Sequence, residues 1–205
     1  DITALHNALL SQAGLLSFHG PTGNDGWSSF NADQFRRVFF EREPMEYRNP
    51  SERGDELVQR RGRTITVTGG KARGALVGGN LTVLTALCGT PYLPDFDGAI
   101  LFLEDVDEAP YRIDRMLTTL KLSGVLDRVA GVVFGACTSC TPGDGYGSLT
   151  LSQIFEDWFA PLKVPAYHGA QFGHIRQQFI LPVGAEVELD ADAGTLRMLE
   201  PVFRG

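Results

Sequence analysis

The sequence lacks three features that would each assign it to a class of protein. It has no apolar run near the roughly 18 residues of a membrane-spanning helix, so no membrane span is predicted. It has no excess of basic residues, and a net charge of −7 argues against nucleic acid as the main partner. Nor is it poor in hydrophobic residues, which make up 43% of the 205. These properties predict a globular protein with a substantial core.

Cysteine is also scarce. Only Cys88, Cys137 and Cys140 are present, and an odd, sparse set argues against a disulfide framework. Cys137 and Cys140 have CxxC spacing, but a structural zinc site needs four ligands and no second pair exists. The glycine-rich segment 69–80 matches neither phosphate-binding motif, because Lys71 precedes the later glycines. We therefore predict no zinc site and no phosphate loop.

The first residue is aspartate rather than an initiator methionine, and no signal peptide is visible. Residues 2–13 have the periodicity of a helix, with Ile2, Leu5 and Leu9 on one face and Gly14 as its stop. A domain rarely begins with a buried helix, so we expect further chain before Asp1.

Strands and helices alternate in the middle of the chain, which predicts an α/β fold. Residues 99–103 form an apolar run of the kind seen in strands buried on both faces, and Glu104 ends it. A helix from Pro110 to Gly124 and a second buried strand over 129–134 follow. Because ligands bind outside the carboxyl ends of such strands, Glu104 is placed for chemistry. A helix-entry or solvent-facing role is the alternative.

Other segments are predicted from turn and cap residues. Residues 22–48 include a short helix and 64–68 a strand. Residues 69–80 are a glycine-rich turn whose glycines allow close approach of backbone, and Asn80 can cap a helix over 81–88. Ser148 or Thr150 can cap a helix that contains Trp158. Residues 179–199 are predicted as antiparallel β structure with a hairpin turn at 190–194. Between Tyr47 and residue 63 the apolar pattern lapses, which indicates an interdomain linker. The arginines at 60–63 could contact an anion or be a site of activating cleavage, but a solvated loop is the simpler interpretation.

Six motifs occur in the order typical of one family. They are Asp1-Ile-Thr-Ala-Leu-His6, Gly69-Gly-Lys-Ala-Arg-Gly, Gly78-Gly-Asn-Leu81, Leu101-Phe-Leu-Glu-Asp105, Ala109-Pro-Tyr-Arg-Ile-Asp-Arg115 and Gly173-His174. The chain resembles the LD-carboxypeptidases, serine peptidases that remove D-alanine from murein tetrapeptides. The microcin C resistance hydrolases are relatives. The resemblance implies a cytoplasmic, homodimeric enzyme of peptidoglycan recycling that uses no metal and no cofactor.

The family uses a Ser–His–Glu triad, and the resemblance assigns its last two places to Glu104 and His174. A histidine with a pKa of about 6.5 can accept the serine proton and return it to the leaving amine. The glutamate would hold the tautomer and stabilise the imidazolium. His168 is a competitor, but Gly173-His174 matches the family pattern. We expect His6 and His19 to be structural, with His19 a candidate to line the site.

The nucleophile aligned with the family would stand immediately before Asp1, and no serine of this chain lies in a G-x-S-x-G elbow. The resemblance makes the backbone N–H of Asp1 part of the oxyanion hole. We expect the chain alone to be inactive, with an N-terminal segment of the same enzyme as partner. The chain would then be one product of a cut enzyme or an expression fragment.

A murein tetrapeptide carries carboxylates, so its binding site needs cations. The best candidate is Arg112, although pairing of Arg112 and Arg115 with Glu108 or Asp114 fits equally well. Asn80 is a second candidate for substrate binding, and helix capping explains it too. The remaining basic candidates are Lys71, Arg73 and Arg176.

The predicted fold is α/β in two parts. Residues 1–47 would be the end of a Rossmann-like N-terminal domain, 48–69 a linker, and 70–205 a C-terminal α/β domain with a mixed sheet. The predicted function is an LD-carboxypeptidase. The alternatives are a microcin C-type self-immunity hydrolase that cleaves peptidyl nucleotides and a non-catalytic fragment or dimerisation half.

Overall fold

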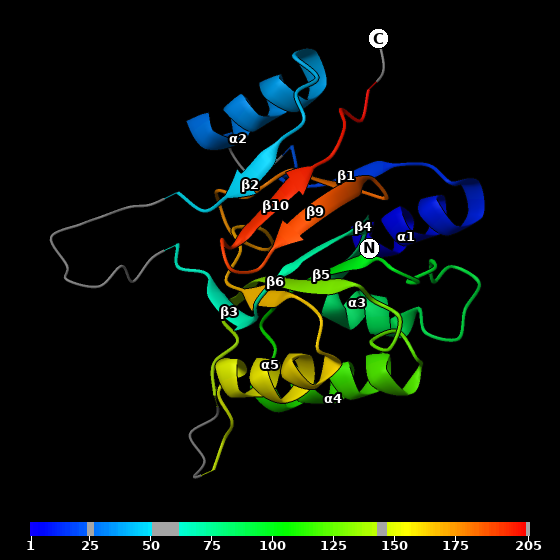
Figure 1. Ribbon diagram of the computed structural model, residues 1–205, viewed down its shortest axis with the longest axis vertical. Coiled ribbons are helices and arrows are strands. Elements are labelled where there is room, and N and C mark those ends of the chain that lie inside the picture. The colour runs from blue at the N-terminus through cyan, green and yellow to red at the C-terminus, as the bar shows by residue number, and fades with distance from the viewer. Residues whose placement is uncertain (24–26, 51–61, 143–146, 204–205) are drawn as a thin grey trace, which may run out of the picture.

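The computed structural model describes residues 1–23, 27–50, 62–142 and 147–203. An eight-stranded mixed sheet in the order β2-β10-β9-β4-β5-β6-β7-β3 forms its centre, and β1 and β8 form a second, two-stranded sheet. The predicted mixed α/β fold is confirmed (Figure 1). The strands are β1 Ser17–His19, β2 Glu46–Arg48, β3 Ile65–Thr68, β4 Lys71–Asn80, β5 Ile100–Val106, β6 Gly131–Thr138, β7 Ala166–His168, β8 Leu181–Val183, β9 Glu186–Asp190 and β10 Thr195–Met198. The helices are α1 Ile2–Ala13, α2 Ser29–Phe35, α3 Leu81–Ala86, α4 Pro110–Leu122 and α5 Leu151–Phe159, with a π-helical turn at Arg36–Phe40 and a 3-10 turn at Ala160–Leu162.

Strands β4, β5, β6 and β7 are parallel and form the inner part of the sheet, whereas β9, β10 and β2 extend it in antiparallel fashion. Helices α4 and α5 lie side by side against one face (Figure 1). Two clusters of buried apolar side chains pack on the two faces of the sheet. One joins the helices to residues such as Leu101 and Phe134, and the other joins Phe102 and Val133 to β2, β9 and β10.

The helix predicted after Glu104 is confirmed as α4. Pro110 stands at its start, and Ile113, Leu117 and Leu120 are fully buried. Burial of each such side chain stabilises the fold by about 1.5–3 kcal/mol. For α5 the cap is Thr150, whose hydroxyl accepts from the N–H of Gln153 while the Gln153 side chain accepts in return.

The prediction of a glycine-rich turn over 69–80 is wrong, because residues 71–80 form the ten-residue strand β4. Its glycines admit neighbouring backbone. A Cβ on Gly74 would overlap the carbonyl of Gly98, and one on Gly78 would overlap that of Phe102. The predicted close approach of backbone is therefore confirmed at Gly74 and Gly78, where it allows close packing of strands. The end of the next strand also differs, since β5 continues past Glu104 to Val106.

The antiparallel tail is confirmed, with β9 and β10 joined by a hairpin in which the N–H of Ala193 donates to Asp190 Oδ1. Strand β2 pairs with β10, and Tyr47 is buried in the cluster that also holds Leu196. The division into 1–47, 48–69 and 70–205 stays a prediction, and half of the proposed linker, residues 51–61 with 60 and 61 among them, lies outside the described residues. Of the helices that the structure describes, the longest has 13 residues, fewer than a membrane span requires.

Candidate active site

Glu104 lies within β5 between β4 and β6, and its side chain is 1% exposed. A carboxylate in this position is costly unless a partner compensates for its lost hydration. Burial raises the pKa of Glu104, and a hydrogen bond with His174 opposes that rise. Oε1 has no hydrogen-bond partner among the described residues, and the hydrogen bond with His174 is made by Oε2.

His174 follows β7 in a loop that turns at Gly173, whose φ is +111°. Its Nδ1 lies 2.8 Å from Glu104 Oε2. A Cβ at position 173 would approach the same carboxylate oxygen to 2.8 Å, so only glycine lets the loop pass this close. The hydroxyl of Thr138 donates to the backbone oxygen of His174 at 2.9 Å and fixes the loop from β6.

This pair has the chemistry of a general base. With Nδ1–H donated to the Glu104 carboxylate, Nε2 carries a lone pair that can accept a proton from a hydroxyl. The side chain of His174 is 53% exposed, so its ring is accessible from outside the core. The carboxylate would stabilise the imidazolium that forms.

A cavity of about 480 Å³ lies against His174. Its lining includes Ile2 and His6 from α1, His19 from β1, and Arg176 from the loop that follows His174. Burial, together with the neighbouring His6 and His174, lowers the pKa of His19 to about 4, and burial also lowers the pKa of His6. Near pH 7 these two imidazoles are therefore neutral. From the sequence, both histidines are expected to be structural, with His19 as a candidate to line the site, and both line this cavity.

The structure places His168 elsewhere. It is the last residue of β7, its ring packs against Phe155 with centroids 5.0 Å apart, and it does not line the cavity. Asp1 caps α1 by accepting from the N–H of Thr3, one residue from the cavity wall at Ile2.

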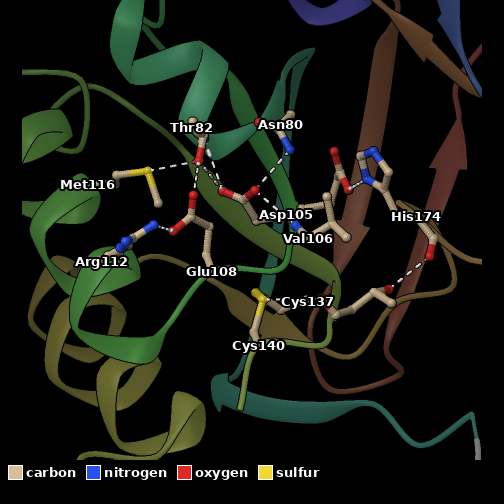
Figure 2. The surroundings of a disulfide bond; sticks show 12 residues. Asn80, Thr82, Asp105, Val106, Glu108, Arg112, Met116, Cys137, Cys140 and His174 are labelled. Atoms are coloured by element: carbon tan, nitrogen blue, oxygen red, sulfur yellow. Dashed lines mark hydrogen bonds and ion pairs between the residues drawn. A yellow bond between two sulfur atoms is a disulfide. The ribbon is translucent and has the colours of Figure 1, made fainter. Parts of the chain in front are cut away.

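The two predicted substrate ligands are engaged in other contacts. Asn80 caps α3 by accepting from the N–H of Val83, and its amide donates to Asp105 Oδ1 at 3.0 Å (Figure 2). Arg112 pairs with Glu108, with Nη1 3.4 Å from Oε2 (Figure 2). Neither Asn80 nor Arg112 lines the cavity, so their role in substrate binding stays a prediction. Lys71 and Arg73 pair with carboxylates on β9, and Arg115 lies near the ring of Tyr111.

Sequence reasoning missed two features near His174. The first is a disulfide between Cys137 and Cys140, which flanks Thr138 at the end of β6 (Figure 2). The small, odd number of cysteines argues against disulfides, whereas the CxxC spacing of Cys137 and Cys140 is compatible with this one.

The second missed feature is a pair of buried amides on α2. Asn31 and Gln34 hold the loop after His174 through hydrogen bonds to its backbone. No local pattern in the sequence indicates these contacts, because they join residues about 145 positions apart.

Fold and site together define an α/β protein with a buried carboxylate–imidazole pair at the wall of a cavity. That arrangement suits an enzyme that activates a hydroxyl nucleophile. Residues 73–189 match the LD-carboxypeptidase C-terminal domain, and the chain belongs to this family.

Three known proteins show how far the similarity extends. The probable murein peptide carboxypeptidase of Bacillus subtilis is 37% identical over 195 residues, which cover 93% of this chain and 58% of the relative. The muramoyltetrapeptide carboxypeptidase of Oxalobacter formigenes superposes with a TM-score of 0.79 at 30% identity, covering 97% of this chain and 65% of that one. The microcin C7 self-immunity protein MccF of Escherichia coli is 23% identical over 98% of this chain and 64% of its own length. The chain thus spans less than two thirds of these relatives.

Proposed function

We propose that this chain belongs to a murein tetrapeptide carboxypeptidase, a serine peptidase that releases the terminal D-alanine. The observation that carries the proposal is the 2.8 Å contact between His174 Nδ1 and Glu104 Oε2 at the wall of a cavity. Relatives named as carboxypeptidases of murein or muramoyl peptides support the choice of substrate.

The nucleophile in this mechanism is a serine immediately before Asp1. Ile2 and His174 line the same cavity, which supports a nucleophile at the position before Asp1 that exchanges its proton with this imidazole. The serine hydroxyl attacks the carbonyl carbon that precedes D-alanine, and its proton passes to His174 Nε2. The N–H of Asp1 donates to the oxyanion.

Collapse of the tetrahedral intermediate breaks the C–N bond, and His174 returns the proton to the departing amine of D-alanine. A water molecule, deprotonated by the same imidazole, then hydrolyses the acyl-enzyme. Glu104 stays ionised throughout and stabilises the imidazolium in both steps.

The proposal extends to the surroundings of the enzyme. The segment before Asp1 acts as the partner that carries the nucleophile, the enzyme is a homodimer, and it works in the cytoplasm. The greater length of the relatives supports the first of these statements. Light scattering of the full-length protein would test the dimer, and cell fractionation would test the compartment.

The test of function is product analysis with the full-length protein. Murein tetrapeptide should yield the tripeptide and free D-alanine, detected by mass spectrometry. Cleavage of an aminoacyl sulfamoyl nucleotide with no release of D-alanine would instead favour the self-immunity hydrolase. Hydrolysis of neither compound would favour a non-catalytic role.

A further inference from the structure

One charged side chain of the cavity has no role in the mechanism described above. Arg176 lines the cavity two residues beyond His174, is exposed, and forms no ion pair with any described residue. Most other described arginines are paired with carboxylates: Arg36, Arg37, Arg48, Arg73, Arg112, Arg128 and Arg197. An unpaired guanidinium in a cavity is available to a ligand.

The loop that carries Arg176 is held by buried groups. Asn31 is completely buried; its amide donates to the backbone oxygen of Arg176 at 2.9 Å and its Oδ1 accepts from the N–H of Gln178 at 3.2 Å. Gln34, three residues along α2, repeats the pattern with Gln178 and Ile180. Four hydrogen bonds from one helix face thus fix the backbone over 176–180, so the guanidinium projects from an ordered base.

Charge selects the ligand. Three histidines line the cavity beside Arg176. Burial lowers the pKa of His6 and of His19, so both are neutral near pH 7, and His174 is the general base. Arg176 is therefore the permanently charged side chain among the described lining residues. A carboxylate is the planar anion that a guanidinium binds through two hydrogen bonds. In a peptide, the terminal α-carboxylate is one residue from the carbonyl carbon of the last peptide bond. Arg176 and His174 line the same cavity, so one bound peptide can present its carboxylate to Arg176 and that carbonyl carbon to the site of His174.

We infer that Arg176 binds the terminal α-carboxylate of the peptide whose last bond His174 helps to cleave, and so selects carboxypeptidase over endopeptidase cleavage. The inference rests on the proposed function. It names the residue that would distinguish a free C-terminus from an internal peptide bond.

Binding measured without turnover tests the inference separately from activity. In the full-length protein carrying His174→Ala, calorimetry compares murein tetrapeptide with its C-terminal amide. The acid should bind at least about tenfold more tightly than the amide, because a charged hydrogen-bonded pair is lost in the amide. Adding Arg176→Gln should lower the affinity for the acid about 10- to 100-fold and change the affinity for the amide by less than about twofold. The preference for the acid should therefore disappear. Arg176→Lys should retain part of it.

Arg128→Gln is the matched control, since Arg128 is paired with Asp95 and Asp97 and does not line the cavity. It should leave both affinities unchanged. Equal binding of acid and amide, equal weakening of both by Arg176→Gln, or no binding of either peptide would overturn the inference. If the acid is preferred through Arg176 but no D-alanine is released by the unmodified protein, the proposed function fails and the carboxylate site stands.

Discussion

His174 Nδ1 and Glu104 Oε2 lie 2.8 Å apart, and the two residues differ sharply in environment, because the carboxylate is buried and the imidazole is half exposed. Replacing Glu104 with glutamine keeps the shape but removes the charge that stabilises an imidazolium. We expect Glu104→Gln to lower kcat for D-alanine release by about 10²- to 10⁴-fold with little change in KM. Glu186→Gln, at an exposed position on β9, is the control. A kcat within threefold of the unmodified enzyme would exclude the proposed role of Glu104.

Gly173→Ala should disturb the same contact. The substitution forces a side chain onto a residue with φ +111° and places Cβ 2.8 Å from Glu104 Oε2. We expect kcat to fall at least about tenfold and the free energy of unfolding to fall by about 1–3 kcal/mol. Gly89→Ala separates the two effects, because φ is +81° there but no atom lies within 4 Å of the added Cβ. Gly89→Ala should lower the free energy of unfolding without lowering kcat. An equal loss of kcat in both variants would show that contact with Glu104 is not the cause.

Stability should depend on pH through His19. Burial lowers its pKa to about 4 in the folded protein, against 6.5 for an exposed imidazole. Between these values the unfolded chain binds a proton that the folded chain does not, so the free energy of unfolding decreases as pH falls from 6.5 to 4. His19 alone accounts for up to about 3 kcal/mol. Urea unfolding of the full-length protein at several pH values measures this, and His19→Gln should flatten the dependence. An unchanged slope would show that His19 titrates normally.

The disulfide provides a further test. Thr138, which donates to the backbone oxygen of His174, lies between Cys137 and Cys140. Reduction by a dithiol converts the disulfide to two thiols and frees this turn, so we expect kcat to fall about twofold to tenfold through misplacement of the imidazole. The double variant Cys137→Ser, Cys140→Ser should not respond to the reductant, whereas Cys88→Ser, which removes the free cysteine, should respond as the unmodified enzyme does. If the reductant also lowers kcat in the double variant, the effect does not come from this disulfide and the explanation is wrong.

The sequence predicts elements whose signals are local. A few consecutive residues are enough to predict three of these elements: the strand from the apolar run at 99–103, the helix from the periodicity that begins at Pro110, and the hairpin from the turn residues at 190–194. β4 escaped prediction because glycine is typical of turns, and only contact with neighbouring strands explains it.

In the candidate site, too, the residues that local sequence indicates can be predicted, and those that depend on tertiary contacts cannot. The position of Glu104 at the end of an apolar run indicates its role, although β5 continues to Val106. Only the resemblance to a family indicates its partner His174. The amides of Asn31 and Gln34 gave no signal, because their partners are fixed by the tertiary fold.

The most direct test of the central claim compares two histidines six residues apart. Full-length His174→Ala and His168→Ala are assayed for kcat/KM of D-alanine release from murein tetrapeptide, with circular dichroism to establish folding. We predict a loss of at least about 10³-fold for His174→Ala and less than about fivefold for His168→Ala, whose ring packs against Phe155 away from the cavity. Retention of activity by folded His174→Ala, or a greater loss in His168→Ala, would contradict the assignment of the catalytic base.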